Sequence, residues 1–355
     1  MSNSIDTRLR EAILRTVAYG DIFHYPVTQA EVCRYLIETS RSPLAVENAL
    51  CQLVLADKLS QIGDYYCLPG QESTISIRQK RALNADSLWP HAIHYGKVIG
   101  QLPFVRMVAI TGSLAVDNID ADGDIDYMIV TEPGHLWTTR MMIVALVKWV
   151  QREGITLCPN YLITENALYI EEHNLFTARE ISQMIPVTGS DTYNRFRQVN
   201  CWTDHYFPNA ASRPPEPVFT VDTVQRSSSK LVERLLRTPP GNWLDQWEMQ
   251  RKINKFAQQA PDAIEADFNR DWCKGHFDGH MMRVLQAYED RINQLLPSDK
   301  QPKPIMIEQK TDMQQEKLLF GQSYYLRFDQ KLWDAMQPYP PLGTLYAASY
   351  MRERG

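Results

Sequence analysis

The chain has 355 residues, a formal net charge of −5, 44% hydrophobic residues and 22% charged residues. This length accommodates two or three domains, and the composition is that of a globular protein. The negative balance excludes a global basic field of the kind that holds proteins on nucleic acid or on a membrane surface.

The amino-terminal segment carries no targeting pattern. It is polar and mixed in charge, so a signal peptide is not expected. The longest apolar helical stretch, residues 141–150, is far shorter than the ~20 residues that cross a bilayer. The six cysteines are scattered, which favours reduced core residues over a disulfide framework. These patterns predict a cytoplasmic protein that does not contact a membrane.

Residues 1–70 are predicted to form a domain of three helices and a hairpin. Apolar spacing indicates a first helix at 8–19. Thr28 and Glu31 make a capping box at the start of the second helix, and Ser42 caps a third helix that begins with proline. Two short strands around Gly63 follow. This order resembles a winged helix-turn-helix domain.

The charges of this domain argue against DNA as its ligand. Residues 1–70 contain six Arg and Lys residues against eight Asp and Glu residues. Phosphate contacts from Lys and Arg dominate affinity for DNA. DNA binding is therefore unlikely, and the domain is expected to contact a protein partner or to close over a site elsewhere in the chain.

The central region is predicted to be an α/β domain. A linking helix bent at Pro90 occupies 71–104, and the α/β domain covers 105–212. Its predicted strands are 105–111, 124–131, 156–163 and 167–172. Its predicted helices are 135–154, which ends at Gly154, and 176–185. From about residue 190 the chain is expected to be irregular.

The remaining residues are predicted to form a helical subdomain and a tail. Helices at 224–237, 242–259 and 278–296 lie within a subdomain that spans 213–300. Residues 301–355 form a proline-rich linker and a truncated-looking tail. In this tail, Pro340, Pro341, Leu342 and Gly343 resemble the opening of the cobalamin-binding domain of radical-SAM enzymes. No iron–sulfur cysteines or cobalamin ligand accompany them, so no cofactor is inferred.

The stretch VAITGSLAVDNIDADGDIDYMIV, residues 108–130, carries the candidate site. Asp124 and Asp126 are two residues apart in a strand pattern, so both side chains lie on one face. Two carboxylates this close favour a cation between them, and Mg²⁺ accepts such ligands together with substrate phosphates. The turn at Gly112 and Ser113 offers backbone N–H groups and a hydroxyl to a phosphate.

A calcium-binding turn is the alternative interpretation of this aspartate-rich loop. An EF-hand loop needs a bidentate Glu at its twelfth position. Counted from Asp120 or from Asp122, that position holds Thr131 or Pro133. The loop therefore does not match an EF-hand.

These residues resemble the signature of the DNA polymerase β-like nucleotidyltransferase superfamily. In this chain Gly112 and Ser113 are separated by ten residues from Asp124-Ile125-Asp126-Tyr127. The resemblance implies a mixed sheet with flanking helices, Mg²⁺ (or Mn²⁺) bound by the two aspartates, and an NTP substrate. It implies transfer of a nucleoside monophosphate to an unknown acceptor (small molecule, protein or RNA) with release of pyrophosphate.

The family adds a third carboxylate on a later strand, and here the sequence departs from it. Asn160 occupies the expected position but cannot act as a base. Glu171 has the required chemistry but lies further along the chain. A nucleotide-binding regulatory protein without turnover, acting through its winged helix, is therefore the alternative function.

Overall fold

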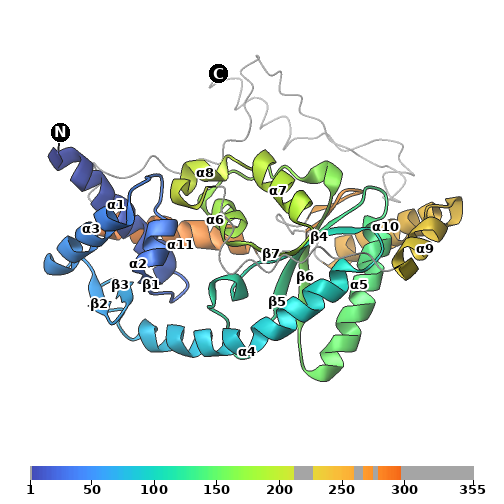
Figure 1. Ribbon diagram of the computed structural model, residues 1–355, viewed down its shortest axis with the longest axis horizontal. Helices are drawn as coiled ribbons and strands as arrows, with labels where there is room; N and C mark the ends of the chain where they lie inside the picture. The colour runs from blue at the N-terminus through green and yellow to red at the C-terminus, as the bar shows by residue number, and fades with distance from the viewer. Residues whose placement is uncertain (1, 212–226, 260–266, 275–278, 297–355) are drawn as a thin grey trace, which may run out of the picture. The chain divides into compact units, whose positions relative to one another are not determined.

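The computed structural model describes residues 2–211, 227–259, 267–274 and 279–296 (Figure 1). They form mixed α/β architecture, as predicted. The predicted linker and tail, with the motif at Pro340 to Gly343, lie outside the described residues. Within the described ranges, no helix is both long and apolar enough to span a membrane.

The amino-terminal unit consists of three helices and a small antiparallel sheet, as predicted. Its helices are α1 (Ser2–Asp21), α2 (Gln29–Arg34) and α3 (Pro43–Leu55). Its strands are β1 (Val27–Thr28), β2 (Ser60–Ile62) and β3 (Tyr65–Cys67), in the order β1-β3-β2. The capping box at α2 is confirmed, because Thr28 N–H donates to the Glu31 carboxylate at 2.8 Å and Thr28 Oγ1 accepts from Glu31 N–H.

A six-stranded mixed sheet forms the centre of the fold. Its order is β7-β4-β5-β6-β9-β8, in which β5 and β6 are parallel and the other neighbours are antiparallel. The strands are β4 (Val105–Ile110), β5 (Ile125–Thr131), β6 (Leu157–Thr164), β7 (Ile185–Thr188), β8 (Asp267–Phe268) and β9 (Trp272–Lys274). The helix α5 (Leu136–Val150) makes the crossover between the two parallel strands, as such a connection requires.

Helices cover both faces of this sheet. One face packs against α4 (Thr74–Gly100), α5 and α10 (Pro239–Gln259) through side chains such as Ile110, Tyr127 and Ile129. The other face packs against α6 (Leu175–Gln183) and α7 (Ser190–Val199) through Met128 and Val130. The linking helix α4 runs from the amino-terminal unit to the sheet, with Pro90 inside it (Figure 1).

The strand predicted at 167–172 is wrong. Residues Glu165–Ala167 form a short 3-10 helix, and the following residues pair with no strand. Leu168 and Ile170 are buried in alternation, which produced the strand-like pattern. The Asn200 side chain takes the place of a ladder partner, since it accepts from Ile170 N–H at 2.9 Å and donates to the Leu168 carbonyl at 2.7 Å.

Two further expectations are corrected. Residue 185, predicted as the end of a helix, begins the fully buried edge strand β7. Pro186 is tolerated there because an edge strand needs a hydrogen-bonding partner on one side only. The chain beyond 190 is not irregular, because α7 and α8 (Thr203–Tyr206) follow directly. Polar residues on the exposed face of α7 masked its apolar stripe, which includes Tyr193 and Phe196.

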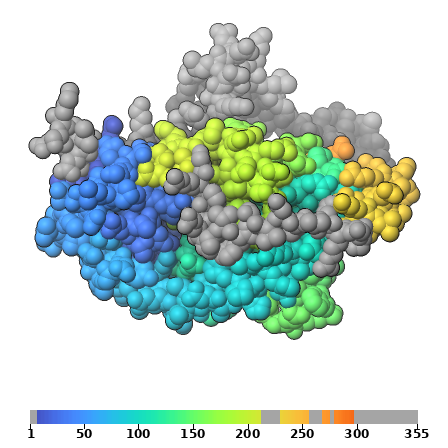
Figure 2. Space-filling view, in the orientation of Figure 1, coloured from blue at the N-terminus to red at the C-terminus, as the bar shows by residue number. Residues whose placement is uncertain are grey.

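The carboxy-terminal helices pack on different parts of the chain. The helix α9 (Ser227–Leu236) contacts α10, which packs on α5, whereas α11 (His280–Leu295) packs against α1. The segment after α8 is bonded to α2, where Asn209 Nδ2 donates to the Cys33 carbonyl at 2.7 Å. In Figure 2 the blue surface of the amino-terminal unit is contiguous with the yellow-green surface of α7 and α8. The amino-terminal unit is thus joined to the rest of the fold through α11 and through the segment after α8.

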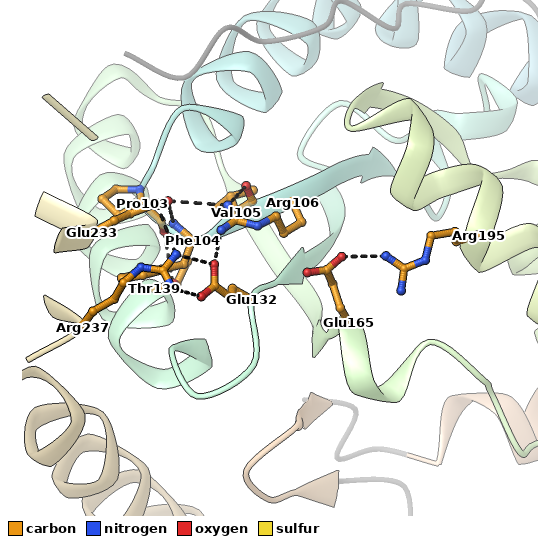
Figure 3. Close-up of polar contacts among 10 residues, drawn as sticks. All are labelled: Pro103, Phe104, Val105, Arg106, Glu132, Thr139, Glu165, Arg195, Glu233 and Arg237. Atoms are coloured by element: carbon orange, nitrogen blue, oxygen red, sulfur yellow. Dashed lines mark hydrogen bonds and ion pairs between the residues drawn. The ribbon is translucent and has the colours of Figure 1, made fainter. Parts of the chain in front are cut away.

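A charged network fixes α9 at the start of β4 (Figure 3). Phe104 has the left-handed φ of 66°, which is unfavourable for a bulky side chain. Its N–H donates to Glu233 at 2.8 Å, and its ring stacks on His135 at 3.8 Å between centroids. Glu132 binds both Arg106 and Arg237. Glu233 is only 7% exposed, so its buried negative charge depends for its stabilisation on the Phe104 N–H and on the same two arginines.

Replacement of Glu233 by Gln is expected to lower the free energy of unfolding by about 1–3 kcal/mol, because the buried negative charge that pairs with Arg106 and Arg237 is lost. Chemical denaturation measures the change. Glu165→Gln is the matched control, since its partner Arg195 is 56% exposed and such pairs contribute about 0–1 kcal/mol. Equal losses in the two variants would contradict a structural role for the buried network.

Candidate active site

The turn after β4 places a glycine directly against a carboxylate. Gly112 has φ of 66°, and a Cβ built there would lie 2.4 Å from Asp126 Oδ2. Glycine is therefore favoured both by the left-handed backbone and by the close approach of the Asp126 carboxylate. Ser113 is exposed and opens a 3-10 helix of only three residues, so no helix dipole of consequence acts there.

The two aspartates share one face of the sheet, as predicted. Asp126 lies in β5 and Asp124 immediately precedes it, and both are half-buried. Ile125 and Tyr127 are fully buried on the opposite face. The apolar anchors on that face fix the register of the strand, so the carboxylates are directed toward the layer that contains α6.

Cys158 completes a cluster with these aspartates, and the sequence analysis missed it. Cys158 lies opposite Asp126 in the parallel ladder of β5 and β6. One ligand atom each from Asp124, Asp126 and Cys158 lie within 4.8 Å of one another, and among the described residues this is the group that could hold a metal ion. The predicted residue Asn160 lies beside the cluster, donating its amide to Asp126 and accepting from Cys158 Sγ at 2.8 Å.

Glu180 is a third carboxylate that the sequence analysis also missed. It is half-buried on α6, where its Oε2 accepts from Gly112 N–H at 3.3 Å and its Oε1 from Gln183 at 2.7 Å. It therefore binds the turn that was predicted to hold phosphate. Gly112 and Glu180 are 68 residues apart, and no local spacing connects them.

Two carboxyl groups at this site, those of Asp126 and Glu180, hold protons more tightly than usual. Burial, reinforced by the charges of Asp124 and Glu180, raises the pKa of Asp126 to about 8. Burial raises the pKa of Glu180 to about 7, against the opposing hydrogen bond from Gly112. Burial and the two aspartate charges also raise the pKa of the Cys158 thiol. The site is thus short of positive charge.

The other aspartates of the loop have structural partners. Asp117 accepts from the Trp89 indole at 2.7 Å, and Asp120 forms two bonds with Arg81 at 2.8 and 2.9 Å. Both partners lie on α4. These carboxylates tie the loop to the helix, which leaves few oxygen ligands for the calcium-binding alternative.

A cavity of about 550 Å³ opens beside the carboxylates. Gly112, Ser113, Asp126, Asn160 and Glu180 line one part of it. This volume is within the range of small-molecule sites. The structure thereby brings together the predicted turn, one predicted aspartate and the predicted asparagine, with Asp124 and Cys158 adjoining them.

The amino-terminal unit supplies much of the remaining wall. Tyr19, Phe23 and Tyr25, from the end of α1 and the loop after it, face the same cavity as Phe176 and Met281. This part of the wall is apolar and aromatic. The amino-terminal unit therefore forms part of the cavity wall.

Glu171 is not brought to the site. It is exposed and does not line the cavity. Arg81, Arg179 and Lys274 do line it, but each already has an acidic or polar partner: Asp120, Gln183 and Glu172 respectively. Arg179 also stacks over the Tyr35 ring at 3.4 Å.

Comparison of the chain with protein-family models, with curated proteins and with solved structures found no match.

Proposed function

We propose that the protein is a metal-dependent nucleotidyltransferase. The observation that carries the proposal is the Asp124, Asp126 and Cys158 cluster at the edge of a small-molecule cavity, directly beside the Gly112-Ser113 turn. A cation between paired carboxylates and a glycine turn for phosphate are the two parts that phosphoryl chemistry needs.

The donor set fits a divalent cation. Asp124 and Asp126 would hold it through carboxylate oxygens, which suit Mg²⁺ or Mn²⁺. When bound, such an ion neutralises charge on the phosphates of an NTP. Asn160 would position Asp126 through the hydrogen bond that it donates, in the way that outer ligands orient inner ones.

Glu180 is the best placed general base. In the proposed reaction, an acceptor hydroxyl oxygen forms a bond to the α-phosphorus of the NTP. The bond from that phosphorus to the bridging oxygen breaks, pyrophosphate leaves, and the hydroxyl proton passes to the Glu180 carboxylate. A pKa of about 7 suits this role, since bases work best near the ambient pH.

The cavity supports a small acceptor with an apolar body. Its aromatic residues, which include Phe23 and Phe176, line the same cavity as Asp126 and Glu180. An acceptor with its hydroxyl at Glu180 would place an apolar body against the aromatic residues of the amino-terminal unit. In this proposal the winged-helix-like unit closes the acceptor site.

A second candidate function is nucleotide binding without turnover. It is favoured by Glu180, which occupies the Gly112 N–H that a phosphate would need, and by cations that already have partners. In that case the protein would act as a regulator and signal to a partner through its amino-terminal unit.

The test is pyrophosphate release from each NTP with Mg²⁺, Mn²⁺ or Co²⁺, with 2-phenylethanol or bulk RNA as the acceptor. Release stimulated by the alcohol is expected. Glu180→Gln is expected to lower kcat by about 10²–10⁴-fold and to remove the acidic limb of its pH profile. Glu171→Gln is the matched control and should retain full activity.

Two results would count against this proposal. NTP binding without pyrophosphate release under any condition would support the regulatory alternative. Equal losses in Glu171→Gln and Glu180→Gln would remove Glu180 from its role as base, because Glu171 lies outside the cavity.

A further inference from the structure

The third ligand position of the candidate metal site holds sulfur. Asp126 and Cys158 are cross-strand partners in a parallel ladder, so their side chains lie on the same face. One ligand atom each from Asp124, Asp126 and Cys158 lie within 4.8 Å of one another, so all three side chains are grouped around one point that an ion could occupy.

The surrounding side chains orient the thiol toward the carboxylates. Cys158 is half-buried, and Asn160 bridges it to Asp126 by accepting from the sulfur and donating to the carboxylate. A single amide therefore holds the sulfur and one carboxylate in a fixed relation, as outer groups do at metal sites.

The two carboxylates alone suit Mg²⁺, but the three-residue set that includes the Cys158 sulfur does not. Mg²⁺ takes oxygen ligands in near-ideal octahedral geometry, whereas thiolate suits softer ions. Two carboxylates and one thiolate form a mixed set of the kind that Zn²⁺ and Co²⁺ accept in tetrahedral sites with one position left for water or substrate.

We infer that Asp124, Asp126 and Cys158 bind a thiophilic divalent ion of the Co²⁺ and Zn²⁺ type in preference to Mg²⁺. The inference rests on the metal site of the proposed function but not on nucleotide transfer. Cys158 is the residue that sets the choice of ion, and Asn160 positions it. A separate Mg²⁺ that arrives with the NTP phosphates is compatible with this assignment.

The experiment is a Co²⁺ titration of the full-length, chelator-treated protein, followed by absorption spectroscopy. A thiolate-to-cobalt charge-transfer band is expected in the near ultraviolet, and an excess of Mg²⁺ should not remove it. Cys158→Ser should abolish the band and weaken Co²⁺ binding by about 10–100-fold. Cys201→Ser is the control, since Cys201 is an exposed thiol away from the cluster.

A second variant keeps the test independent of folding defects in the first. Cys158→Asp offers oxygen in place of sulfur and is expected to bind Mg²⁺ more tightly and Co²⁺ less tightly than the wild type. Circular dichroism checks that each variant is folded. A wild-type protein that shows no charge-transfer band, or that exchanges Co²⁺ for Mg²⁺ as readily as Cys158→Ser does, overturns the inference.

The outcomes for metal choice and for catalysis are separable. A charge-transfer band without pyrophosphate release would retain the metal assignment and remove the transferase proposal. Pyrophosphate release with Mg²⁺ alone, and no band with Co²⁺, would retain the transferase and remove the metal assignment.

Discussion

Replacement of Asp126 by Asn is expected to stabilise the metal-free protein at pH 8 while it abolishes pyrophosphate release. The pKa of Asp126 is raised to about 8, chiefly by burial and then by the charges of Asp124 and Glu180. An unfolded Asp releases its proton near pH 4. Between these pH values the folded state holds the proton more tightly, so the free energy of unfolding falls as pH rises from about 4 toward 8.

Asn does not ionise, so the variant does not lose free energy of unfolding through this group as the pH rises. Because Asp126 is half-buried, the expected gain at pH 8 is about 1–3 kcal/mol, below what the full pKa shift would imply. Loss of a metal-binding carboxylate is expected to lower kcat/KM by at least about 10³-fold, or about 4 kcal/mol. The two effects have opposite signs, as expected where a site keeps like charges together for function.

The measurement is urea unfolding in the presence of a chelator at pH 5.5, 7.0 and 8.5. The stability of the wild type should decline across this range, and that of Asp126→Asn should decline less. Asp122→Asn is the control, because Asp122 is an exposed aspartate in the same loop. If the free energy of unfolding declines equally with pH in the wild type and in Asp126→Asn, the raised pKa of Asp126 does not affect stability, whatever the activity of the variant.

Replacement of Gly112 by Ala is expected to displace the Asp126 carboxylate. The added Cβ would lie 2.4 Å from Asp126 Oδ2, too close for any side-chain carbon, so the carboxylate or the turn must move. A displacement of about 1 Å at a catalytic group can lower the rate by about 10²-fold. We expect at least this loss in kcat/KM and weaker Co²⁺ binding.

Gly154→Ala separates this clash from backbone strain. Gly154 has a similar positive φ of 80°, but a Cβ there would meet nothing within 4 Å. Both variants should lose about 1–2 kcal/mol of stability from the left-handed backbone. Only Gly112→Ala should lose activity and metal affinity. Normal metal binding in Gly112→Ala would show that the close approach to Asp126 has no role in the site.

The sequence predicted the elements whose cause is local. The capping box of Thr28 and Glu31 is confirmed. Gly154 ends the helical segment as predicted, but α5 itself ends at Val150 and the last turn, Gln151–Glu153, is a 3-10 helix. The alternation around Ile125 and Tyr127 placed both aspartates on one face. The predicted strand at 167–172 is wrong because its burial pattern is satisfied by packing and by Asn200, without a neighbouring strand.

The sequence predicted only those residues of the candidate site that lie in one turn and in the strand pattern after it. Gly112, Ser113, Asp124 and Asp126 could be selected from spacing. Asn160 was selected by its order in the chain and lies beside the cluster, whereas Glu171 does not line the cavity. Their roles in catalysis remain predictions that the variants above test.

The sequence by itself determined the turn, the paired carboxylates and their common face, because two-residue periodicity and glycine's backbone freedom act over a few neighbouring residues. Only the tertiary structure placed Cys158 opposite Asp126, Glu180 on the Gly112 N–H and the end of α1 in the cavity wall. These contacts join segments far apart in the chain, and they depend on strand register and helix packing. Strand register and helix packing are set by contacts between distant segments, so no local pattern of residues predicts them.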